Sequence, residues 1–349
     1  MIKIAQIGCG YWGPNILRSL RMLNTCELKA LVEIDVKRRE FVKSRYPNVD
    51  VTDKIDKVLN DDEIQGVVIA TPAESHYHLT KLCLEANKHV LVEKPLATNL
   101  LDAIELTNIS YEKKLTLMVG HVFLYNPAVI LLKKIIQEQI DNLYYFYSQR
   151  LNFGRIRQDV NVWWNLAPHD LSILLYLMND EEPISIKVEG FSFTQSHLED
   201  IAFATLKWKN NITANIHLSW LDPKKVRQLT VVGSKKMIVY NDLSEDKIAV
   251  HDKSIDCNNH FDDPGKVLFN HRVGDIAFPK IDMKEPLLLE LEHFITSILS
   301  KSKPKTGPLH ACRVINILDA GQRSIINKGE EVNIESVGKL DRKYAESTL

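Results

Sequence analysis

Lys94 is the first residue whose neighbours in the sequence suggest a catalytic role. It follows the apolar segment 89–92 and stands between Glu93 and Pro95. Proline is the one residue whose preceding peptide bond readily tolerates the cis form, so a fixed Lys-Pro corner would hold the ammonium group in a set direction. The alternative is an ordinary surface lysine beside a loop proline, and the triplet alone does not decide between the two.

A second reactive group is His169, in the stretch from Trp163 to Asp170. Pro168 suits the first turn of a helix, so we predict that a helix begins there and continues through the apolar segment 171–178. A histidine at a helix N-terminus has its cationic form disfavoured, so His169 is expected to be neutral near pH 7 and able to accept a proton.

Other histidines and a purely structural interpretation compete with this assignment. His76 and His78 also lie early in a predicted helix, and their spacing does not choose among the three histidines. The same stretch is explained equally well if Asn165 is a turn or cap residue and Asp170 is a carboxylate favoured by the helix dipole.

A glycine-rich turn at the amino terminus would bring a cofactor to these groups. The apolar segment Ile2–Ile7 leads into Gly8, Gly10 and Gly13, in the G-x-G-x-x-G spacing of dinucleotide-binding turns. Such glycines allow a tight turn, a close approach of the backbone to pyrophosphate, and close packing of the helix on the strand. Phosphate would rest at the helix N-terminus, which favours anions. The alternative is a plain strand-to-helix turn.

Glu33 is the acidic residue expected to bind the ribose. It lies twenty residues after Gly13, at the end of the apolar run 28–32, where an acidic side chain would hold the ribose hydroxyls and repel a 2′-phosphate. We therefore predict NAD as the cofactor. NADP stays possible because Lys37, Arg38 and Arg39 lie close by, although these could equally be the exposed face of the next helix.

Alternating strands and helices must position these groups. Apolar strand-like runs at 66–70, 89–92 and 115–119 alternate with helix-like segments at 35–45, 75–87 and 100–113. This order predicts βαβ units and a doubly wound parallel sheet, a Rossmann fold, with ligands beyond the carboxyl ends of the strands. The loops expected at that edge are the glycine turn, Glu33, Thr71-Pro72, Glu93-Lys94-Pro95 and Gly120-His121.

From about Leu143 the pattern changes to strand-like alternation, at 143–152, 184–195, 201–208, 212–220, 227–232 and 237–240, with helices again at 285–300 and 309–327. We predict an α/β chain with a Rossmann domain over 1–122 and a C-terminal α/β domain over 123–349, which has a large open, mostly antiparallel sheet. The C-terminal helices could pack back on the first domain. An open sheet needs a cover, so a homodimer or homotetramer formed through this sheet is expected.

Composition describes an ordinary globular protein. The chain has 349 residues, 44 basic and 45 acidic side chains, and a net charge of −1. This balance predicts no nucleic-acid or membrane partner. No uninterrupted apolar run approaches eighteen residues, and we expect a cytoplasmic protein. The five cysteines are scattered without a C-x-x-C pair, which favours reduced thiols over disulfides or zinc ligands, and we predict no metal site.

The motifs together resemble the glucose-fructose oxidoreductase, inositol dehydrogenase and rhizopine catabolism (Gfo/Idh/MocA) family. The resemblance runs from Met1 to about Gly329. It rests on the glycine turn, Ala70-Thr71-Pro72 with Ser75 and His78 nearby, Glu93-Lys94-Pro95, and His169-Asp170. The residues at 10–15 and 166–170 are similar to those of bacterial family members that act on sugars and nucleotide sugars.

The resemblance implies a tightly held NAD(P) and reversible oxidation of one sugar hydroxyl. The family's catalytic lysine falls on Lys94 and its acid/base histidine on His169. Asn165 stands where many members have an aspartate, which removes a negative charge and should leave Lys94 less basic than in those relatives. The expected cofactor contacts are Gly8, Gly10, Tyr11, Trp12, Gly13, Glu33, Thr71, Pro72, His76, Glu93 and Lys94. The expected substrate contacts are Lys94, Tyr125, Asn126, Arg155, Arg157, Asn165 and His169; for the two arginines, a solvated loop charge is an equal alternative.

The leading hypothesis is an NAD-dependent dehydrogenase that oxidises a ring hydroxyl, at C3, of a nucleotide-linked hexose such as a UDP-N-acetylhexosamine. One alternative is a reductase of a keto-sugar nucleotide, and another is a dehydrogenase of free sugar or inositol. A non-catalytic NAD(P)-sensing regulatory protein is an alternative of a different class, because this fold also serves such proteins.

Overall fold

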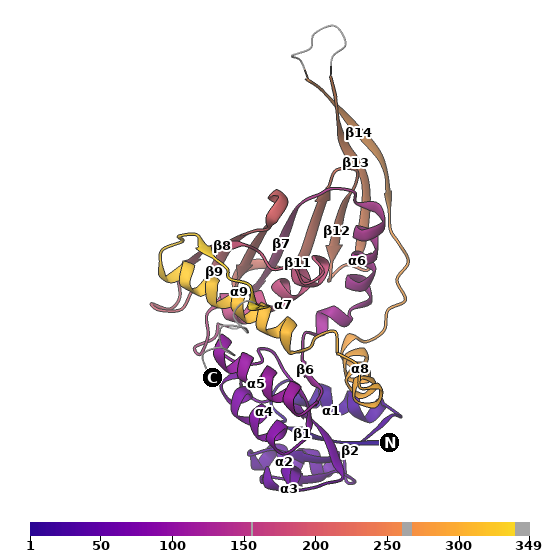
Figure 1. The fold of residues 1–349 in the computed structure, drawn as a ribbon, viewed down its shortest axis with the longest axis vertical. Coiled ribbons are helices and arrows are strands. Elements are labelled where there is room, and N and C mark those ends of the chain that lie inside the picture. Colours follow the sequence, from indigo (N-terminus) through magenta and orange to yellow (C-terminus); the bar gives the residue numbers. More distant parts are fainter. Residues whose placement is uncertain (155, 260–266, 339–349) are drawn as a thin grey trace. The chain divides into compact units, whose positions relative to one another are not determined.

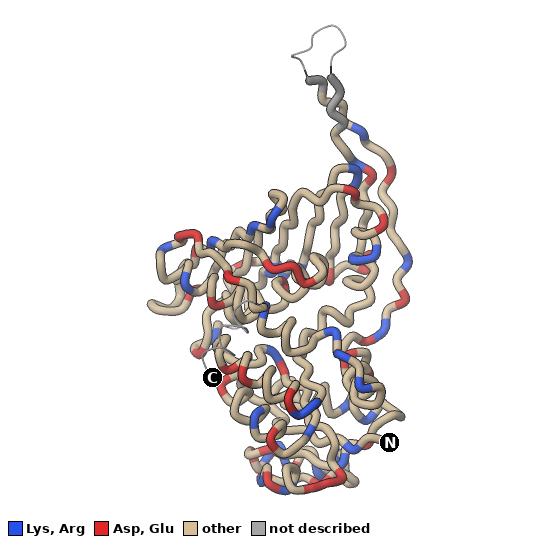
Figure 2. Tube along the Cα trace, in the orientation of Figure 1, with Lys and Arg blue, Asp and Glu red and all other residues tan. Residues whose placement is uncertain are grey.

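The computed structural model describes residues 1–154, 156–259 and 267–338. Contacts between residues divide the chain into two compact units. Of the described residues, the first unit contains 1–126, 284–316 and 336–338, and the second contains those within 127–283 and 317–335. Figure 1 labels the elements of both units, and Figure 2 shows acidic and basic residues interspersed along the trace.

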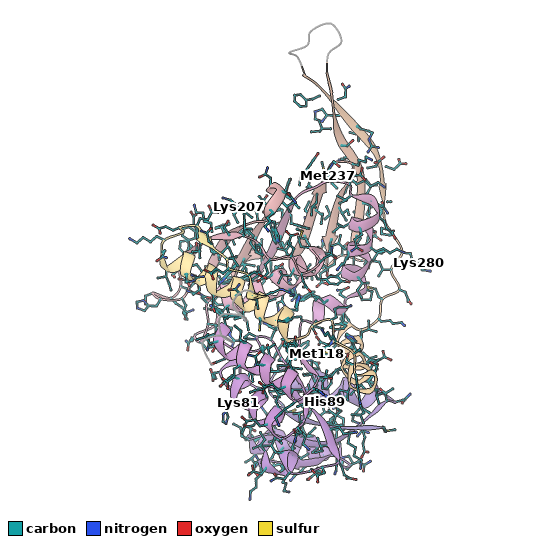
Figure 3. The ribbon with its side chains drawn as sticks, viewed as in Figure 1. Lys81, His89, Met118, Lys207, Met237 and Lys280 are labelled. Carbon is teal, nitrogen blue, oxygen red and sulfur yellow. The ribbon has the colours of Figure 1, made fainter. Side chains whose placement is uncertain are left out.

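The first unit is built on a six-stranded parallel sheet in the order β3-β2-β1-β4-β5-β6. This is the strand order of a dinucleotide-binding Rossmann sheet, whose order reverses between β1 and β4. Its strands are β1 (Ile2–Ile7), β2 (Cys26–Val32), β3 (Asp50–Thr52), β4 (Ile64–Ile69), β5 (His89–Val92) and β6 (Leu117–Val119). His89 and Met118, labelled in Figure 3, lie on β5 and β6.

Helices connect these strands as the alternation predicts. They are α1 (Gly13–Met22), α2 (Val36–Arg45), α3 (Asp56–Leu59), α4 (His76–Glu85) and α5 (Leu100–Glu112), with the short turns η1 (Ala73–Ser75) and η2 (Val122–Tyr125). Side-chain caps fix two of the starts, because Asp35 accepts a hydrogen bond from the N–H of Arg38 and Asn99 accepts one from that of Asp102.

One later helix completes the first unit. α8 (Pro286–Ser300) packs against α1 and η2. A Cβ on Gly66 of β4 would lie 3.4 Å from the Ile298 side chain and 3.5 Å from that of Phe294, so α8 also lies directly on the sheet. Apolar faces of α8 therefore fill the core of a unit whose other elements come from residues 1–126.

The second unit has a nine-stranded sheet in the order β14-β13-β12-β11-β7-β10-β9-β8-β15. All neighbours are antiparallel except β10 and β7. The strands are β7 (Leu143–Phe153), β8 (Ser185–Phe191), β9 (Ile201–Lys207), β10 (Thr213–Ser219), β11 (Leu221–Gly233), β12 (Met237–Asn241), β13 (Ile248–Asn259), β14 (Val267–Ala277) and β15 (Val332–Asn333). The expected α/β fold class, with a parallel Rossmann sheet and a second, mostly antiparallel sheet, is confirmed.

Helices cover part of this second sheet. α6 (Pro127–Gln139) contacts β12, and α7 (Val162–Leu177) contacts β9 and β10. α9 (Pro308–Ile326) is divided between the two units, and η3 (Lys209–Asn211) joins β9 to β10. β13 and β14 continue beyond the end of β12 as a two-stranded hairpin, which Figure 1 shows extending past the rest of the sheet.

Candidate functional site

The glycine turn lies at the carboxyl end of β1, beside the end of β4. Gly8 has a φ of +91°, and a Cβ there would lie 2.6 Å from the carbonyl oxygen of Ala70. A Cβ on Gly13 would lie 2.8 Å from the carbonyl oxygen of Gly8. Both positions therefore require glycine, the first for its conformation and both for close backbone packing.

Gln6 holds this turn together and was not among the predicted residues. Its buried amide Nε2 donates to the carbonyl oxygens of Gly8 and Gly13, at 2.9 Å each. The available signal was a polar amide between the apolar residues Ala5 and Ile7 of β1, since a buried amide must find partners.

Gly10 has few neighbours at the place where a Cβ would lie. A Cβ built there meets one neighbour within 4 Å, the Nη1 of Arg38 at 3.4 Å. The turn therefore fits the close approach of a pyrophosphate, and Arg38 brings a positive charge to the same place. Tyr11 is 96% exposed and Trp12 38% exposed, so both rings present surface beside the turn.

Glu33 lies at the end of β2, as expected, and both carboxylate oxygens already accept backbone hydrogen bonds. Oε2 accepts from the N–H of Cys9 at 2.6 Å and Oε1 from the N–H of Asp35 at 2.9 Å. The buried carboxylate thus joins the glycine turn to the start of α2. Its negative charge stays at the predicted ribose position, while its hydrogen-bonding capacity is partly used by the protein itself.

Thr71 and Pro72 follow β4, and His76 connects their loop to the one after β5. The imidazole Nε2 of His76 lies 2.9 Å from the carbonyl oxygen of Thr71, and its Nδ1 lies 2.7 Å from that of Pro95. Burial lowers the pKa of His76, and the positive charge of Lys94 lowers it further, although the two carbonyl groups oppose this shift. His76 therefore fixes the spacing of the two loops.

Glu93 and Lys94 follow β5, and the Lys94–Pro95 peptide bond is cis. The Trp12 side chain donates a hydrogen bond to the Glu93 carboxylate, which connects the glycine turn to this loop. Burial raises the pKa of Glu93 to about 7, against the opposing effects of the Lys94 charge and of hydrogen bonds from the Lys94 backbone and Trp12. Lys94 also contributes to the lowered pKa values of His76 and His121, so its ammonium group acts on both loops.

Tyr125, predicted to contact substrate, is buried in η2. Its hydroxyl lies 2.8 Å from Nδ1 of His293 and 3.2 Å from Oγ1 of Thr306. These internal contacts favour a structural role for Tyr125. Asn126 follows directly, is also buried, and donates its backbone N–H to the carbonyl of Phe123 at 3.1 Å.

In the second unit, α7 carries the remaining predicted residues, and the expectation that a helix begins at Pro168 is wrong. The helix begins at Val162, where Asn161 accepts a hydrogen bond from the N–H of Trp164 at 3.0 Å. Pro168 is therefore inside the helix. The Trp163 side chain, which precedes the proline in the helix, is fully buried, and this burial favours the earlier start of α7.

This correction removes the helix-terminus argument for a neutral His169. Asn165 and His169 are four residues apart in α7 and so lie on the same face, one turn from each other. The Asn165 Oδ1 accepts a hydrogen bond from the indole N–H of the buried Trp220 at 3.3 Å. Asn165 is thus held by the sheet, and the helix presents it beside His169.

Asp170 is not a charge at a helix terminus, as one interpretation had it, but half of a buried ion pair. Its Oδ2 lies 2.6 Å from Nε of Arg150 on β7, and its Oδ1 accepts from the hydroxyl of Ser148 at 2.7 Å. The two charged side chains are 8% and 6% exposed. This pair fixes α7, and with it His169, on the sheet.

The two arginines proposed for a diphosphate have different outcomes. Arg155 lies outside the described residues. Arg157 is partly exposed and forms an ion pair with Asp159, and its carbonyl oxygen accepts from Nε2 of Gln195 at 2.7 Å.

The predicted residues therefore form two groups. The cofactor residues and Lys94 gather at the carboxyl edge of the parallel sheet in the first unit, whereas Asn165 and His169 share a helix face in the second. Among the described residues, no cluster of three or more His, Cys, Asp or Glu is arranged to hold a metal ion. Over the same part of the chain, no helix is long and apolar enough to cross a membrane.

Known proteins resemble this chain in both sequence and structure. Residues 2–121 match the oxidoreductase family with an NAD-binding Rossmann fold, and residues 139–239 match the GFO/IDH/MocA C-terminal domain. A scyllo-inositol 2-dehydrogenase (NADP⁺) of Bacillus subtilis is 28% identical over 47% of this chain and 44% of its own. The UDP-N-acetylglucosamine 3-dehydrogenase of Acidithiobacillus ferrooxidans is 27% identical over 48% of this chain and 53% of its own.

The chain thus spans about half the length of the curated relatives it matches. A solved structure of UDP-N-acetylglucosamine 3-dehydrogenase from Acidithiobacillus ferrooxidans covers 94% of this chain and 98% of its own, with a TM-score of 0.78 at 20% identity, which shows a common fold. The two family models together match more than half of the chain, in agreement with the resemblance read from its motifs. The chain belongs to the Gfo/Idh/MocA family of oxidoreductases.

Proposed function

We propose that this protein is an NAD-dependent dehydrogenase that oxidises a ring hydroxyl, at C3, of a nucleotide-linked hexose such as a UDP-N-acetylhexosamine. The observation that carries the proposal is the position of Lys94. It follows β5 at the edge where ligands of a Rossmann sheet bind, and its neighbour Glu93 is hydrogen-bonded to Trp12 of the glycine turn.

Bound NAD would accept a hydride from the carbon that carries the hydroxyl. The hydroxyl must lose a proton at the same time, and His169 on α7 is the proposed acceptor. Lys94 is the proposed donor to the oxygen as negative charge develops on it. Lys94 belongs to the first unit and His169 to the second, so their action on one substrate is part of this proposal.

The proposed cofactor site uses the first unit. Gly8, Gly10 and Gly13 would admit the pyrophosphate, Tyr11 and Trp12 would border the nicotinamide, and the loops with Thr71, Pro72, His76 and Glu93 would complete the edge. Glu33 at the ribose position supports NAD over NADP, because its charge repels a 2′-phosphate. Arg38 beside Gly10 opposes that preference. Affinities for both cofactors, measured for the native chain and for Glu33→Ala and Arg38→Ala, test the choice.

Substrate contacts are proposed mainly in the second unit. Asn165 and His169 lie on one face of α7, and Arg157 is a candidate for a diphosphate, together with Arg155. Asn126 is also retained as a candidate. We further propose that residues 1–122 bind cofactor and residues 123–349 bind substrate, and that the chain assembles as a homodimer or homotetramer. The exposed aromatic residues Tyr145, Tyr147 and Phe203 on the second sheet support such an assembly.

The similarity to a scyllo-inositol 2-dehydrogenase supports a second candidate, oxidation of a free cyclitol or sugar. The same site could also reduce a keto-sugar nucleotide, because one arrangement of groups catalyses both directions. A regulatory protein that binds NAD(P) without catalysis would need neither Lys94 nor His169.

A substrate panel separates these candidates. The full chain is incubated with NAD and, in parallel, UDP-hexoses, dTDP-hexoses, free hexoses and inositols, and reduced cofactor is followed by its absorbance. We expect reduction with a UDP-N-acetylhexosamine. Reduction with free sugars or inositols alone would contradict the nucleotide-sugar proposal.

Lys94→Ala tests the catalytic assignment on the substrate found. We expect turnover to fall at least about a hundredfold while NAD still binds. Lys57→Ala, at an exposed lysine of α3, is the matched control and should leave turnover unchanged. Undiminished turnover in Lys94→Ala would refute the role of the lysine.

A further inference from the structure

A cluster of buried ionisable side chains lies behind the ends of β5 and β6, and the proposed reaction does not use it. Glu290 of α8 is 1% exposed, and its Oε1 has no hydrogen-bond partner among the described residues. His121, just after β6, is 2% exposed, and within the same part of the chain both of its ring nitrogens lack a partner. Such groups are costly to bury, which makes the cluster a candidate for function.

Glu93 connects this cluster to the ligand-binding edge of the sheet. Its Oε2 lies so close to Gly120 that a Cβ there would be 3.0 Å away, and its carboxylate accepts the hydrogen bond from Trp12. The residue keeps some accessible surface while its carboxyl group is densely surrounded. The Glu93 carboxyl group therefore lies at the edge of the sheet beside Trp12 and is shielded from water.

Neighbouring charges act on both carboxyl groups. Burial and the negative charge of Glu93 raise the pKa of Glu290 well above its usual range, which favours the neutral form of Glu290. Lys94 is the cation that acts on Glu93. The ionisable groups that act on one another in and around the cluster are Lys94 beside Glu93, Tyr125 from η2, His121 after β6, Glu290 and His293 from α8, Lys305 before α9 and His310 in α9.

The two oxidation states of a nicotinamide cofactor differ in charge, because the oxidised ring carries one positive charge and the reduced ring is neutral. In a Rossmann sheet, the second half, here β4 to β6, receives the second mononucleotide. A positive charge near a carboxyl group favours the ionised form of that group, and the effect is large where water is excluded.

We propose that Glu93 changes its protonation state with the oxidation state of the bound dinucleotide: it releases its proton when the oxidised form binds, and it keeps the protonation of the free protein when the reduced form binds. This inference rests on the proposed function for the place of the cofactor. Glu290 and Lys94 set the starting condition, since Glu290 favours its neutral form beside Glu93 and Lys94 can balance one carboxylate.

Calorimetry of cofactor binding tests the proposal without turnover. NAD⁺ and NADH are titrated separately into the full chain at pH 7, in two buffers that differ in ionisation enthalpy, which gives the number of protons exchanged. With a pKa of about 7, Glu93 is partly protonated in the free protein at pH 7, so NAD⁺ should release a fraction of a proton per site and NADH close to none. Equal release by the two forms would overturn the proposal.

The pH dependence of affinity supplies a second measurement. Because NAD⁺ favours the ionised carboxylate, its Kd should fall about five- to tenfold from pH 6 to pH 8, while the Kd of NADH changes less than about twofold. Parallel changes for both forms would also contradict the proposal, even if every sugar tested fails as a substrate. The test therefore stands apart from the substrate panel.

Glu93→Gln should bind NAD⁺ without releasing a proton, since the amide keeps the shape of the side chain and can still accept from Trp12. Glu74→Gln is the matched control, at an exposed carboxylate in η1 after the neighbouring strand β4, and it should behave as the native chain. Proton release by Glu93→Gln equal to that of the native chain would assign the effect to another group. If the Gln variant does not fold, the two native measurements still decide.

Discussion

Replacing Asp170 by asparagine should destabilise the second unit through the buried ion pair that fixes α7. The carboxylate lies 2.6 Å from Nε of Arg150 and 2.7 Å from the hydroxyl of Ser148, and both charged side chains are less than a tenth exposed. The neutral amide of Asp170→Asn would leave the Arg150 charge buried without its counter-ion. Removing one partner of such a pair costs about 3–5 kcal/mol, so we expect a loss of that size in the free energy of unfolding.

Urea denaturation followed by circular dichroism measures this loss. Glu138→Gln is the control, because Glu138 pairs with Lys134 at 3.8 Å on the exposed face of α6, and an exposed pair of this kind is worth less than about 0.5 kcal/mol. The double variant Arg150→Met/Asp170→Leu should lose less stability than Asp170→Asn, since neither charge remains buried. A loss below about 1 kcal/mol in Asp170→Asn would refute the reasoning.

Three further predictions concern the cofactor edge, the buried acid and α7. Gly8→Ala should weaken NAD binding more than about tenfold in calorimetry, because the strained φ and the Ala70 carbonyl oxygen 2.6 Å away distort the turn; an unchanged Kd would contradict this. Burial raises the pKa of Glu290 above the 4.5 of an unfolded chain, so its burial costs stability as pH rises above about that value. Glu290→Gln should therefore gain more stability over the native chain at pH 8 than at pH 5 in urea denaturation, and an equal difference at both pH values would show that the carboxyl does not titrate in this way. Asn165→Asp should still accept from Trp220 and should raise the pKa on the acid limb of the activity–pH profile by about one unit; superimposable profiles would exclude an electrostatic role for this position.

Local sequence was sufficient to predict the Rossmann sheet. The glycine turn, the apolar runs of β4 and β5, and the helices between them are each specified by neighbouring residues, because strand, turn and helix signals there have no competing pattern. The same locality placed Glu33 and Lys94 at the ends of their strands.

The errors arose where distant packing outweighs local preference. Pro168 suggested the start of a helix, but Asn161 caps α7 well before that proline and Trp163 fills the core beside α9, with its indole N–H donating to the carbonyl oxygen of Leu318 at 2.9 Å. No local pattern predicted α6 or the β13–β14 hairpin, although these elements extend the second unit at one end of its sheet.

By itself the sequence determined the class of fold, the dinucleotide turn and the family, because these depend on residue types at short, fixed spacings. Only the tertiary structure decided that the Glu33 carboxylate is hydrogen-bonded to the N–H of Cys9, that Asp170 is paired with Arg150, and that the buried Glu290 is close enough to Glu93 to respond to its charge. The physical reason is that burial and charge pairing depend on which segments meet in space. The sequence around a residue does not indicate which distant residues that residue will contact.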